Sequence, residues 1–283
     1  MYDLSVTDAI ILGIVQGFTE WLPISSSGHL VIVQSLLGIT VPAAFDIVIM
    51  AGTIIALLIY FRQRLISLAG GICTGDQAAL RYASFIVIAG IGTALIGFCG
   101  KTFFKGLFYQ PFLVRCLLIV TGIFLLIASR AKPPAGEMTP GKSLVIGIAQ
   151  GIAVAPGISR SGSTIGAALL LGIKAEEAAV FSFLIGIPAM TIASLVTFLE
   201  EPEVSVTFAP LAVATITAFI TGYASIGLLM KRLKENRFVF FAYYLLHRGG
   251  AHLRGTDCSP VVREPWPCTV SRLKMIMAGK FMW

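Results

Sequence analysis

The stretch QGFTEWLPISSSGH, residues 16–29, interrupts an apolar sequence with a carboxylate, an imidazole and a run of three hydroxyls. Polar and ionisable side chains are costly inside a membrane, and where they occur they mark functional sites. The stretch also recurs: a shift of 134 positions without a gap places residues 13–17 on 147–151 and residues 24–28 on 158–162. Glycines, a glutamine and serines match in this one register, which indicates an internal repeat.

Composition places the chain in a membrane. Of its 283 residues, 57% are hydrophobic and 12% are charged, whereas about 25% are charged in a typical soluble domain. This predicts an integral membrane protein. The five cysteines follow no metal-ligand spacing, and the net charge of +7 fits basic cytoplasmic loops better than nucleic-acid binding. We therefore expect no nucleic-acid partner.

Pairs of short apolar segments flank two breaks, one at Pro23 and one at residues 156–157. A helix of about 15 residues spans roughly 22 Å, less than a bilayer core of about 30 Å, so each pair predicts a hairpin that enters the membrane and turns back. Longer runs can span, and 238–246 is half of a span. The short segments are 6–21, 24–37, 143–154 and 160–172, and the longer ones are 44–61, 82–100, 111–129, 176–199 and 208–232.

The connections differ in charge according to the side on which they lie. One set holds eleven basic residues and the other holds two, so the positive-inside rule places the first set in the cytoplasm. Three spans separate the hairpins, so the hairpins enter from opposite faces and the repeat is inverted. The Gly-x-x-x-Gly spacing in 13–17 and 147–151 would let the half-helices approach closely. The basic set is 62–81, 130–142, 173–177 and 231–237, and the other is 101–110 and 200–207.

The sequence therefore predicts an all-α integral membrane protein with an inverted-topology repeat, two re-entrant broken-helix hairpins and five to six transmembrane helices. We assign residues 1–247 to one membrane domain, with the first repeat at 1–130 and the second at 140–247. Residues 248–283 are polar and interrupted by prolines, so we expect them to form a disordered tail outside the fold.

Gln16 and Glu20 lie four residues apart and therefore share one face of the first half-helix. Glu20 is a candidate site residue, although Trp21 beside it is typical of a membrane surface and would also suit a carboxylate there. His29 follows Ser26 by three residues, so their side chains are neighbours on a helix. The imidazole could act as a base, or it could only be hydrogen-bonded packing.

Hydroxyl side chains gather after both breaks, where helix N-termini offer free N–H groups and a positive dipole end. Arg160 lies among them, and arginine binds phosphate oxygens bidentately. Two alternatives remain, because Ser25 could be only an N-cap and Glu20 could be only a structural ion-pair partner of Arg160. Together the two tips suit a phosphate group, with the carboxylate to hold a metal. The hydroxyl residues are Ser25, Ser26, Ser27, Ser159, Ser161 and Thr164.

Residues 136–143, GEMTPGKS, fit the pattern G-x-x-x-x-G-K-S of nucleotide-binding P-loops. That motif binds phosphate only between a strand and a helix of a nucleotide-binding domain. Here it follows a membrane span within a short basic loop, so we expect no nucleotide partner.

Two motifs together are similar to the signatures of one family. Gln16-x-x-x-Glu20 followed by PISSSGH at 23–29, and PGISRSGST at 156–164, resemble those of the undecaprenyl-diphosphate phosphatases of the bacitracin-resistance type. The resemblance covers about residues 1–247, and the polar tail departs from the family, which ends in an apolar span. It implies a multi-pass hydrolase of the cytoplasmic membrane, with its site facing outside, that removes the terminal phosphate of a polyprenyl diphosphate.

The same resemblance implies a role in recycling the lipid carrier of cell-wall peptidoglycan synthesis, a link to antibiotic resistance, and a divalent cation, Mg²⁺ or Ca²⁺. It implies that Glu20, Ser26, His29 and Arg160 are catalytic. Glu20 with Gln16 would position the metal, Ser26 would be the nucleophile or orient a water, and His29 would be acid or base. The expected substrate-binding residues are Gln16, Ser25, Ser27, Ser159, Ser161 and Thr164.

A secondary transporter or lipid flippase is the alternative function, because inverted repeats and broken helices are also features of transporters. Phosphate release from solubilised substrate distinguishes the two classes. The expected partners are the polyprenyl diphosphate and the membrane lipids, and the sequence leaves a homodimer open.

Overall fold

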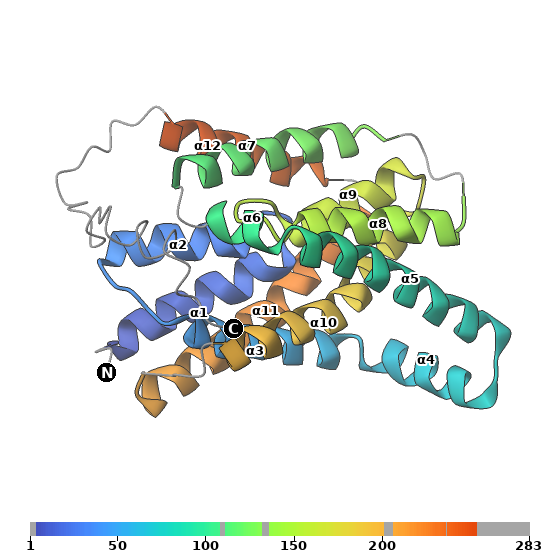
Figure 1. Ribbon diagram of the computed structural model, residues 1–283, viewed down its shortest axis with the longest axis horizontal. Helices are drawn as coiled ribbons and strands as arrows, with labels where there is room; N and C mark the ends of the chain where they lie inside the picture. The colour runs from blue at the N-terminus through green and yellow to red at the C-terminus, as the bar shows by residue number, and fades with distance from the viewer. Residues whose placement is uncertain (1–3, 108–110, 132–135, 201–205, 236, 254–283) are drawn as a thin grey trace.

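The computed structural model describes residues 4–107, 111–131, 136–200, 206–235 and 237–253, and its regular elements in these ranges are α-helices (Figure 1). The all-α fold expected from the sequence is confirmed. The helices are α1 (Val6–Trp21), α2 (Ser26–Leu37), α3 (Ala43–Tyr60), α4 (Arg62–Thr74), α5 (Gln77–Cys99), α6 (Lys101–Leu107), α7 (Pro111–Ala128), α8 (Pro140–Ile152), α9 (Arg160–Leu170), α10 (Ala175–Glu200), α11 (Phe208–Lys234) and α12 (Val239–Leu253).

The first hairpin consists of α1 and α2, which meet at the break around Pro23. Ser5 caps α1 by accepting the backbone N–H of Asp8. The helix ends before Leu22, which precedes the proline and takes an extended backbone with φ −71° and ψ 147°. α2 ends at Gly38, whose left-handed φ of 66° is open to glycine without a side-chain clash. With 16 and 12 residues, both helices are shorter than a bilayer core requires.

The second hairpin consists of α8 and α9, which flank the break at residues 156–157. Thr139 caps α8, and Pro140 lies in its first turn, where a missing N–H costs nothing. This cap explains why α8 begins earlier than the predicted segment 143–154. Ser159 caps α9 through its side-chain oxygen. Both breaks are therefore built from the same pieces: a proline ends one short helix and a serine precedes the next.

Three helices, α5, α10 and α11, are long and apolar enough to cross a membrane, and α3 with α4 adds a fourth if this pair, bent by 71°, is one span. That count rests on length and composition in the described part of the chain. α7, predicted to span as 111–129, is apolar but shorter. The multi-pass membrane character is confirmed, whereas the number of five to six spans and the inverted repeat stay predictions.

Some helices lie where the sequence predicted connections. α4 occupies most of 62–81 and α6 most of 101–110. No residue of α4 is buried, so its sequence has no core-facing stripe to reveal a helix. α12 continues to residue 253, past the predicted domain boundary at 247, and that boundary stays a prediction. Residues 254–283 lie outside the described ranges, and the predicted disorder of the tail is not tested there.

Each half-helix that leads into a break packs on a long helix of the other half of the chain, α1 on α11 and α8 on α5. A side chain at Gly13 would meet a backbone carbonyl of α11, and one at Gly147 would meet a backbone carbonyl of α5. The hydroxyl of Thr221 donates to the carbonyl of Gly13 at 3.4 Å, and that of Thr93 donates to the carbonyl of Gly147 at 3.0 Å. The glycines thus bring each half-helix to a long helix, not the half-helices to each other as the sequence suggested.

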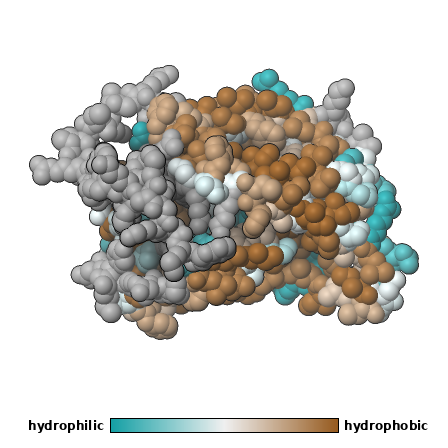
Figure 2. Space-filling view, viewed as in Figure 1, coloured by the Kyte–Doolittle hydropathy of each residue, from teal (hydrophilic) through white to brown (hydrophobic). Residues whose placement is uncertain are grey.

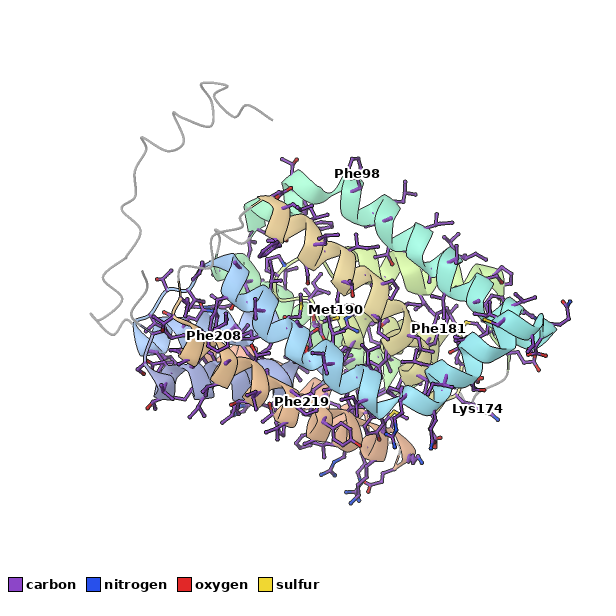
Figure 3. All side chains as sticks on the ribbon, turned by 90° about the horizontal axis from the view of Figure 1, so that it is seen from below. Phe98, Lys174, Phe181, Met190, Phe208 and Phe219 are labelled. Atoms are coloured by element: carbon purple, nitrogen blue, oxygen red, sulfur yellow. The ribbon has the colours of Figure 1, made fainter. Side chains whose placement is uncertain are left out.

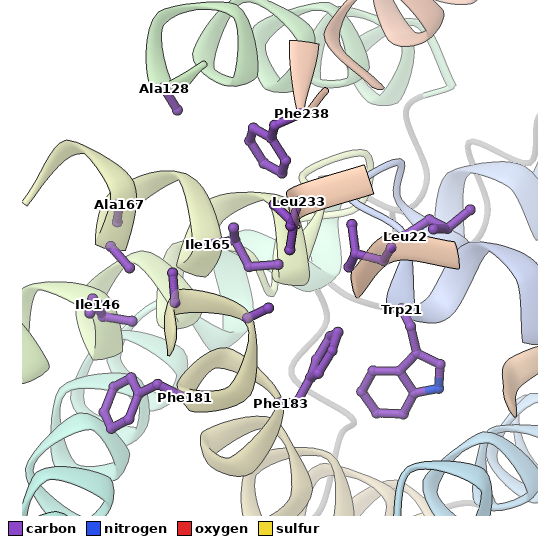
Figure 4. Packing of buried hydrophobic residues seen from close by; sticks show 14 of the residues in the cluster. Trp21, Leu22, Ala128, Ile146, Ile165, Ala167, Phe181, Phe183, Leu233 and Phe238 are labelled. Atoms are coloured by element: carbon purple, nitrogen blue, oxygen red, sulfur yellow. The ribbon is translucent and has the colours of Figure 1, made fainter. Parts of the chain in front are cut away.

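Large apolar side chains lie on the outside of the molecule as well as in its core. Figure 2 shows apolar residues over much of the described surface in that view. Phe98 and Phe208, 83% and 85% exposed, point outward at the periphery in Figure 3. Inside, the rings of Trp21 and Phe183 pack edge to face with centroids 5.3 Å apart (Figure 4). Apolar surface of this extent is compatible with a lipid bilayer as solvent.

Candidate active site

The two broken hairpins meet, and the ends of their helices line one cavity of about 80 Å³. Ser26 and Arg160 are 134 positions apart in sequence and both line it, so the prediction that the two tips meet is confirmed. The lining residues are Thr19, Glu20, Ser25, Ser26, Ser27, Ala153, Ile158, Ser159 and Arg160.

The carboxylate of Glu20 is the acceptor that the two hairpins share. Its Oε2 accepts the amide N–H of Gln16 at 3.1 Å and the hydroxyl of Ser26 at 2.7 Å. Its Oε1 accepts Nη2 of Arg160 at 3.0 Å. Glu20 is only 9% exposed, so its carboxylate is held inside the protein by these three partners. The ion pair weighed as a structural alternative is present, and the same carboxylate also holds the hydroxyl of Ser26.

The guanidinium of Arg160 packs against three residues outside the cavity lining: Trp21, Gly186 and Met190. Its guanidinium carbon is 4.9 Å from the ring centroid of Trp21, a cation–π distance, and Nη2 also contacts Sδ of Met190 at 2.9 Å. A Cβ added at Gly186 would lie 2.5 Å from Nη1, so this glycine leaves room for the guanidinium. Nε and Nη1 are buried without a hydrogen-bond partner among the described residues. The guanidinium therefore has donors to spare for an anion.

Ser25 turns the chain into α2 with a strained backbone. Its φ is 67°, and among the described residues it is the only non-glycine residue with positive φ. A serine held there costs on the order of 1–3 kcal/mol, which the surrounding contacts must offset. Ser25 occupies the N-cap position of α2, as the alternative had it, but its side chain makes no capping hydrogen bond. The N-terminus of α2 is open toward the cavity lined by Ser26 and Ser27.

Three of the predicted substrate-binding residues, Gln16, Ser161 and Thr164, do not line the cavity. Gln16 lies outside its lining and donates its amide N–H to Glu20. The hydroxyl of Ser161 donates to the backbone carbonyl of Leu22 at 3.0 Å and so ties the two hairpins together. Thr164 is fully buried, and its hydroxyl bonds the carbonyl of Arg160 at 2.9 Å and the hydroxyl of Ser182. These contacts hold the tips in place, and their direct role in binding substrate stays a prediction.

His29 also lies outside the cavity lining. Its Nδ1 is 2.8 Å from the backbone carbonyl of Ser25, and its Nε2 is 2.9 Å from the hydroxyl of Tyr244 on α12. Ser26, three residues earlier, directs its hydroxyl to Glu20 instead. The spacing correctly predicted one helix for Ser26 and His29, but the structure does not place the imidazole against the serine hydroxyl.

Sequence reasoning missed several residues of the site. Thr19 lines the cavity, and its position beside Glu20 was the only signal. Trp21, read as a marker of the membrane surface, is fully buried under Arg160. Met190, Gly186 and Tyr244 carried no local signal, because they come from α10 and α12, far from both motifs in sequence. Only packing brings them to the tips.

A divalent cation such as Mg²⁺ or Ca²⁺ needs hard oxygen ligands. Within the described ranges no three His, Cys, Asp or Glu side chains gather into a metal-binding group. Mg²⁺ does not require such a cage, because it keeps several waters and is often held by one or two carboxylates plus substrate phosphates. The Glu20 carboxylate supplies hard oxygen donors at the cavity, and Gln16, outside the cavity lining, donates its amide N–H to that carboxylate. This donor set fits a cation that is shared with a phosphate group.

The chain belongs to the family described as bacitracin resistance protein BacA, which it matches over residues 9–251. This match extends four residues beyond the predicted boundary at 247. The chain is 41% identical to an undecaprenyl-diphosphatase of Syntrophotalea carbinolica, an alignment that covers 87% of this chain and 97% of the relative. It is 40% identical to one of Desulfosudis oleivorans, with 86% and 96% covered, and 37% identical to one of Desulforapulum autotrophicum, with 85% and 95% covered.

Proposed function

We propose that this protein hydrolyses undecaprenyl diphosphate to undecaprenyl monophosphate and inorganic phosphate. The observation that carries the proposal is the cavity in which Glu20, Ser26 and Arg160 are joined by hydrogen bonds. The names of the relatives, undecaprenyl-diphosphatase, support the same reaction. Such a reaction regenerates the monophosphate carrier lipid for cell-wall synthesis, in keeping with a family named for bacitracin resistance.

The cavity suits the head group of such a lipid and not its chain. Its volume of about 80 Å³ is far below the roughly 300–1,000 Å³ of sites that enclose drug-sized ligands. The diphosphate would enter between the hairpin tips, where the open N-terminus of α2 and the spare donors of Arg160 favour negative charge. The prenyl chain would stay outside, along the apolar surface that the helices present to lipid.

Hydrolysis needs a nucleophile at the terminal phosphorus and a group that accepts its proton. The hydroxyl of Ser26 donates to Oε2 of Glu20 at 2.7 Å, so Glu20 is positioned to take the proton from Ser26 or from a water that Ser26 orients. The bond from phosphorus to the bridging oxygen breaks, and the lipid monophosphate leaves. If water attacks, inorganic phosphate forms directly; if Ser26 attacks, a water that gives its proton to Glu20 then hydrolyses the phosphoserine, which releases inorganic phosphate and restores the serine. Arg160 stabilises the charge on the phosphate oxygens. In this proposal Glu20 takes the role of base, and the expected role of His29 as acid or base stays a prediction.

A divalent cation, Mg²⁺ or Ca²⁺, is part of the proposal. Glu20 would hold it with Gln16 and with oxygens of the diphosphate. When bound, it would neutralise charge on the phosphate groups and polarise them toward attack. The Arg160 guanidinium would bind the phosphate oxygens beside it.

The described chain is a multi-pass integral membrane protein, and we propose the cytoplasmic membrane as its location, with the site open to the outer face. Support comes from the basic residues on one set of connections, which the positive-inside rule places in the cytoplasm. Undecaprenyl diphosphate is the expected partner, besides bulk membrane lipids. A homodimer stays a prediction.

The test is phosphate release by the purified protein in detergent. With undecaprenyl diphosphate and Mg²⁺ we expect inorganic phosphate to appear, to stop with a chelator, and to resume with added Mg²⁺ or Ca²⁺. A transporter or flippase would release no phosphate in detergent and would move the lipid only across sealed vesicles. Phosphate release that persists in excess chelator would show that the reaction needs no divalent cation, while the phosphatase activity itself would be supported.

A further inference from the structure

Tyr244 reaches the catalytic hairpin from the last described helix. Its hydroxyl is 2.9 Å from Nε2 of His29, and the two rings stack with centroids 5.8 Å apart and planes 14° apart. Its neighbour Leu245 is buried in the core and packs against α7, which fixes this part of α12. Two residues 215 positions apart are thus held in a defined geometry.

The hydrogen bonds determine which nitrogen of His29 carries the proton in the neutral ring. The backbone carbonyl of Ser25 can only accept, so Nδ1, at 2.8 Å from it, must be the N–H donor. Nε2 then holds the lone pair and accepts the hydroxyl hydrogen of Tyr244. The imidazole passes a chain of hydrogen bonds from the tyrosine to the backbone of the hairpin turn.

The carbonyl at the end of this chain belongs to the strained residue. Ser25 has φ 67°, and its carbonyl accepts both the ring N–H of His29 and the backbone N–H of His29, the latter at 3.3 Å. Ser26 follows directly, and its hydroxyl meets Glu20 at 2.7 Å. Because the Ser25 peptide leads directly into Ser26, its orientation helps to set where the Ser26 hydroxyl points.

We propose that Tyr244 is a positioning residue for the hydrolysis: through His29 it holds the strained Ser25 turn so that Ser26 faces Glu20. It does not line the cavity, and it acts on the reaction only through the imidazole. The inference rests on the proposed phosphatase function for its kinetic effect, and on the hydrogen bonds alone for its structural effect.

The kinetic test compares Tyr244→Phe with Tyr243→Phe. Both variants remove one hydroxyl from adjacent positions of α12, but Tyr243 is 59% exposed and serves as the matched control. Loss of one positioning hydrogen bond should lower kcat about three- to tenfold in Tyr244→Phe, with little change in KM, while Tyr243→Phe keeps wild-type values. Equal turnover in the two variants, per folded molecule, would overturn the proposal.

A double variant tests whether the effect passes through His29. Added to His29→Ala, Tyr244→Phe should cause no further loss of the residual activity, because the link is already broken. An equal fold-loss in both backgrounds would show that Tyr244 acts by another route and would overturn the proposal.

A spectroscopic test does not depend on activity. The ¹⁵N shifts of the His29 ring, assigned by comparison with His29→Ala, should show Nδ1 protonated and Nε2 unprotonated in the neutral form, and the Nε2 signal should move in Tyr244→Phe but not in Tyr243→Phe. Nε2 found protonated in the wild type would overturn the proposal. If the wild type releases no phosphate but the ring shifts behave as expected, the phosphatase function fails and the structural link stands.

Discussion

The two hairpin tips have the same sequence of elements but differ in the backbone conformation and capping of the serine that precedes the second helix. Ser25 and Ser159 occupy equivalent positions 134 residues apart. Ser159 has an ordinary extended backbone, with φ −75°, and caps α9, whereas Ser25 has φ 67° and caps nothing with its side chain. The second tip is regular and the first is strained. Strain that the surrounding structure must offset is typical of the half of a site that performs the chemistry.

The functional groups are likewise divided between the tips and not duplicated. Arg160 stands where the first tip has Ser26, and Val154 stands where the first tip has Glu20. Gln150, the counterpart of Gln16, donates to the hydroxyl of Thr93 at 3.1 Å and thereby supports packing on α5. The first tip therefore supplies the carboxylate of Glu20 and the hydroxyl of Ser26, and the second supplies the guanidinium of Arg160. Neither tip alone could bind a phosphate and attack it.

The largest effect is expected at the first tip, from Glu20→Gln. This variant keeps the size of the side chain but removes the proton acceptor and the anionic metal ligand. Turnover should fall about 10²- to 10⁴-fold, and a higher Mg²⁺ concentration should restore only part of it, because the metal cannot replace the acceptor. Phosphate release per folded molecule across a Mg²⁺ titration measures this, with the surface variant Glu235→Gln as control. Near-normal turnover with lowered thermal stability would show that the ion pair of Glu20 and Arg160 has only a structural role.

At the second tip, Arg160→Lys keeps the charge and loses the planar fork that grips two oxygens. We expect kcat to fall about 10²- to 10³-fold while KM changes less, because the guanidinium stabilises charge mostly in the transition state. Steady-state kinetics with Arg232→Lys as the control gives the comparison, since Arg232 lies outside the cavity lining and contacts Glu235 at 3.6 Å and the Phe240 ring. Unchanged turnover in Arg160→Lys would show that Arg160 does not bind the phosphate through two oxygens in the transition state.

A smaller effect, on stability, is expected where each hairpin packs on its long helix. Gly13→Ala and Gly147→Ala should each lower the free energy of unfolding by about 1–3 kcal/mol, because the new methyl meets backbone that cannot move aside. Gly141→Ala, on α8 with no atom within 4 Å of the added carbon, should be tolerated. Thermal unfolding in one detergent compares the three. If either Gly13→Ala or Gly147→Ala were as stable as Gly141→Ala, the helix packing would not be equally close at both hairpins.

The smallest effect tests the difference in capping. Ser159→Ala removes a side-chain acceptor for the N–H of Gly162, at 3.1 Å, and should cost about 1 kcal/mol. Ser25→Ala removes no cap and should cost clearly less. Equilibrium unfolding of both variants in the same detergent measures the difference. Equal costs would mean that the two tips do not differ in the way their backbones indicate.

Much of this molecule could be read from the sequence, for one physical reason. In an apolar chain every polar side chain is expensive, so Glu20, Arg160 and the hydroxyls stand out, and the prolines show where short helices break. The hairpins, the all-α membrane fold and the meeting of the tips followed from this. The helices α4 and α6 did not: α4 buries no residue and leaves no apolar stripe to read, and α6 has only seven residues, too few to show a helical period.

The tertiary structure alone decided which partner each site residue has. His29 is three residues from Ser26 in sequence, yet its ring binds Tyr244 and the Ser25 carbonyl, while Ser26 binds Glu20. The contacts of Arg160 with Trp21 and Met190 could not be predicted from the sequence either. The sequence determined which groups enter the membrane, because burial of polar groups is a local cost. Which of them meet depends on contacts between helices far apart in the chain, and only packing fixes those.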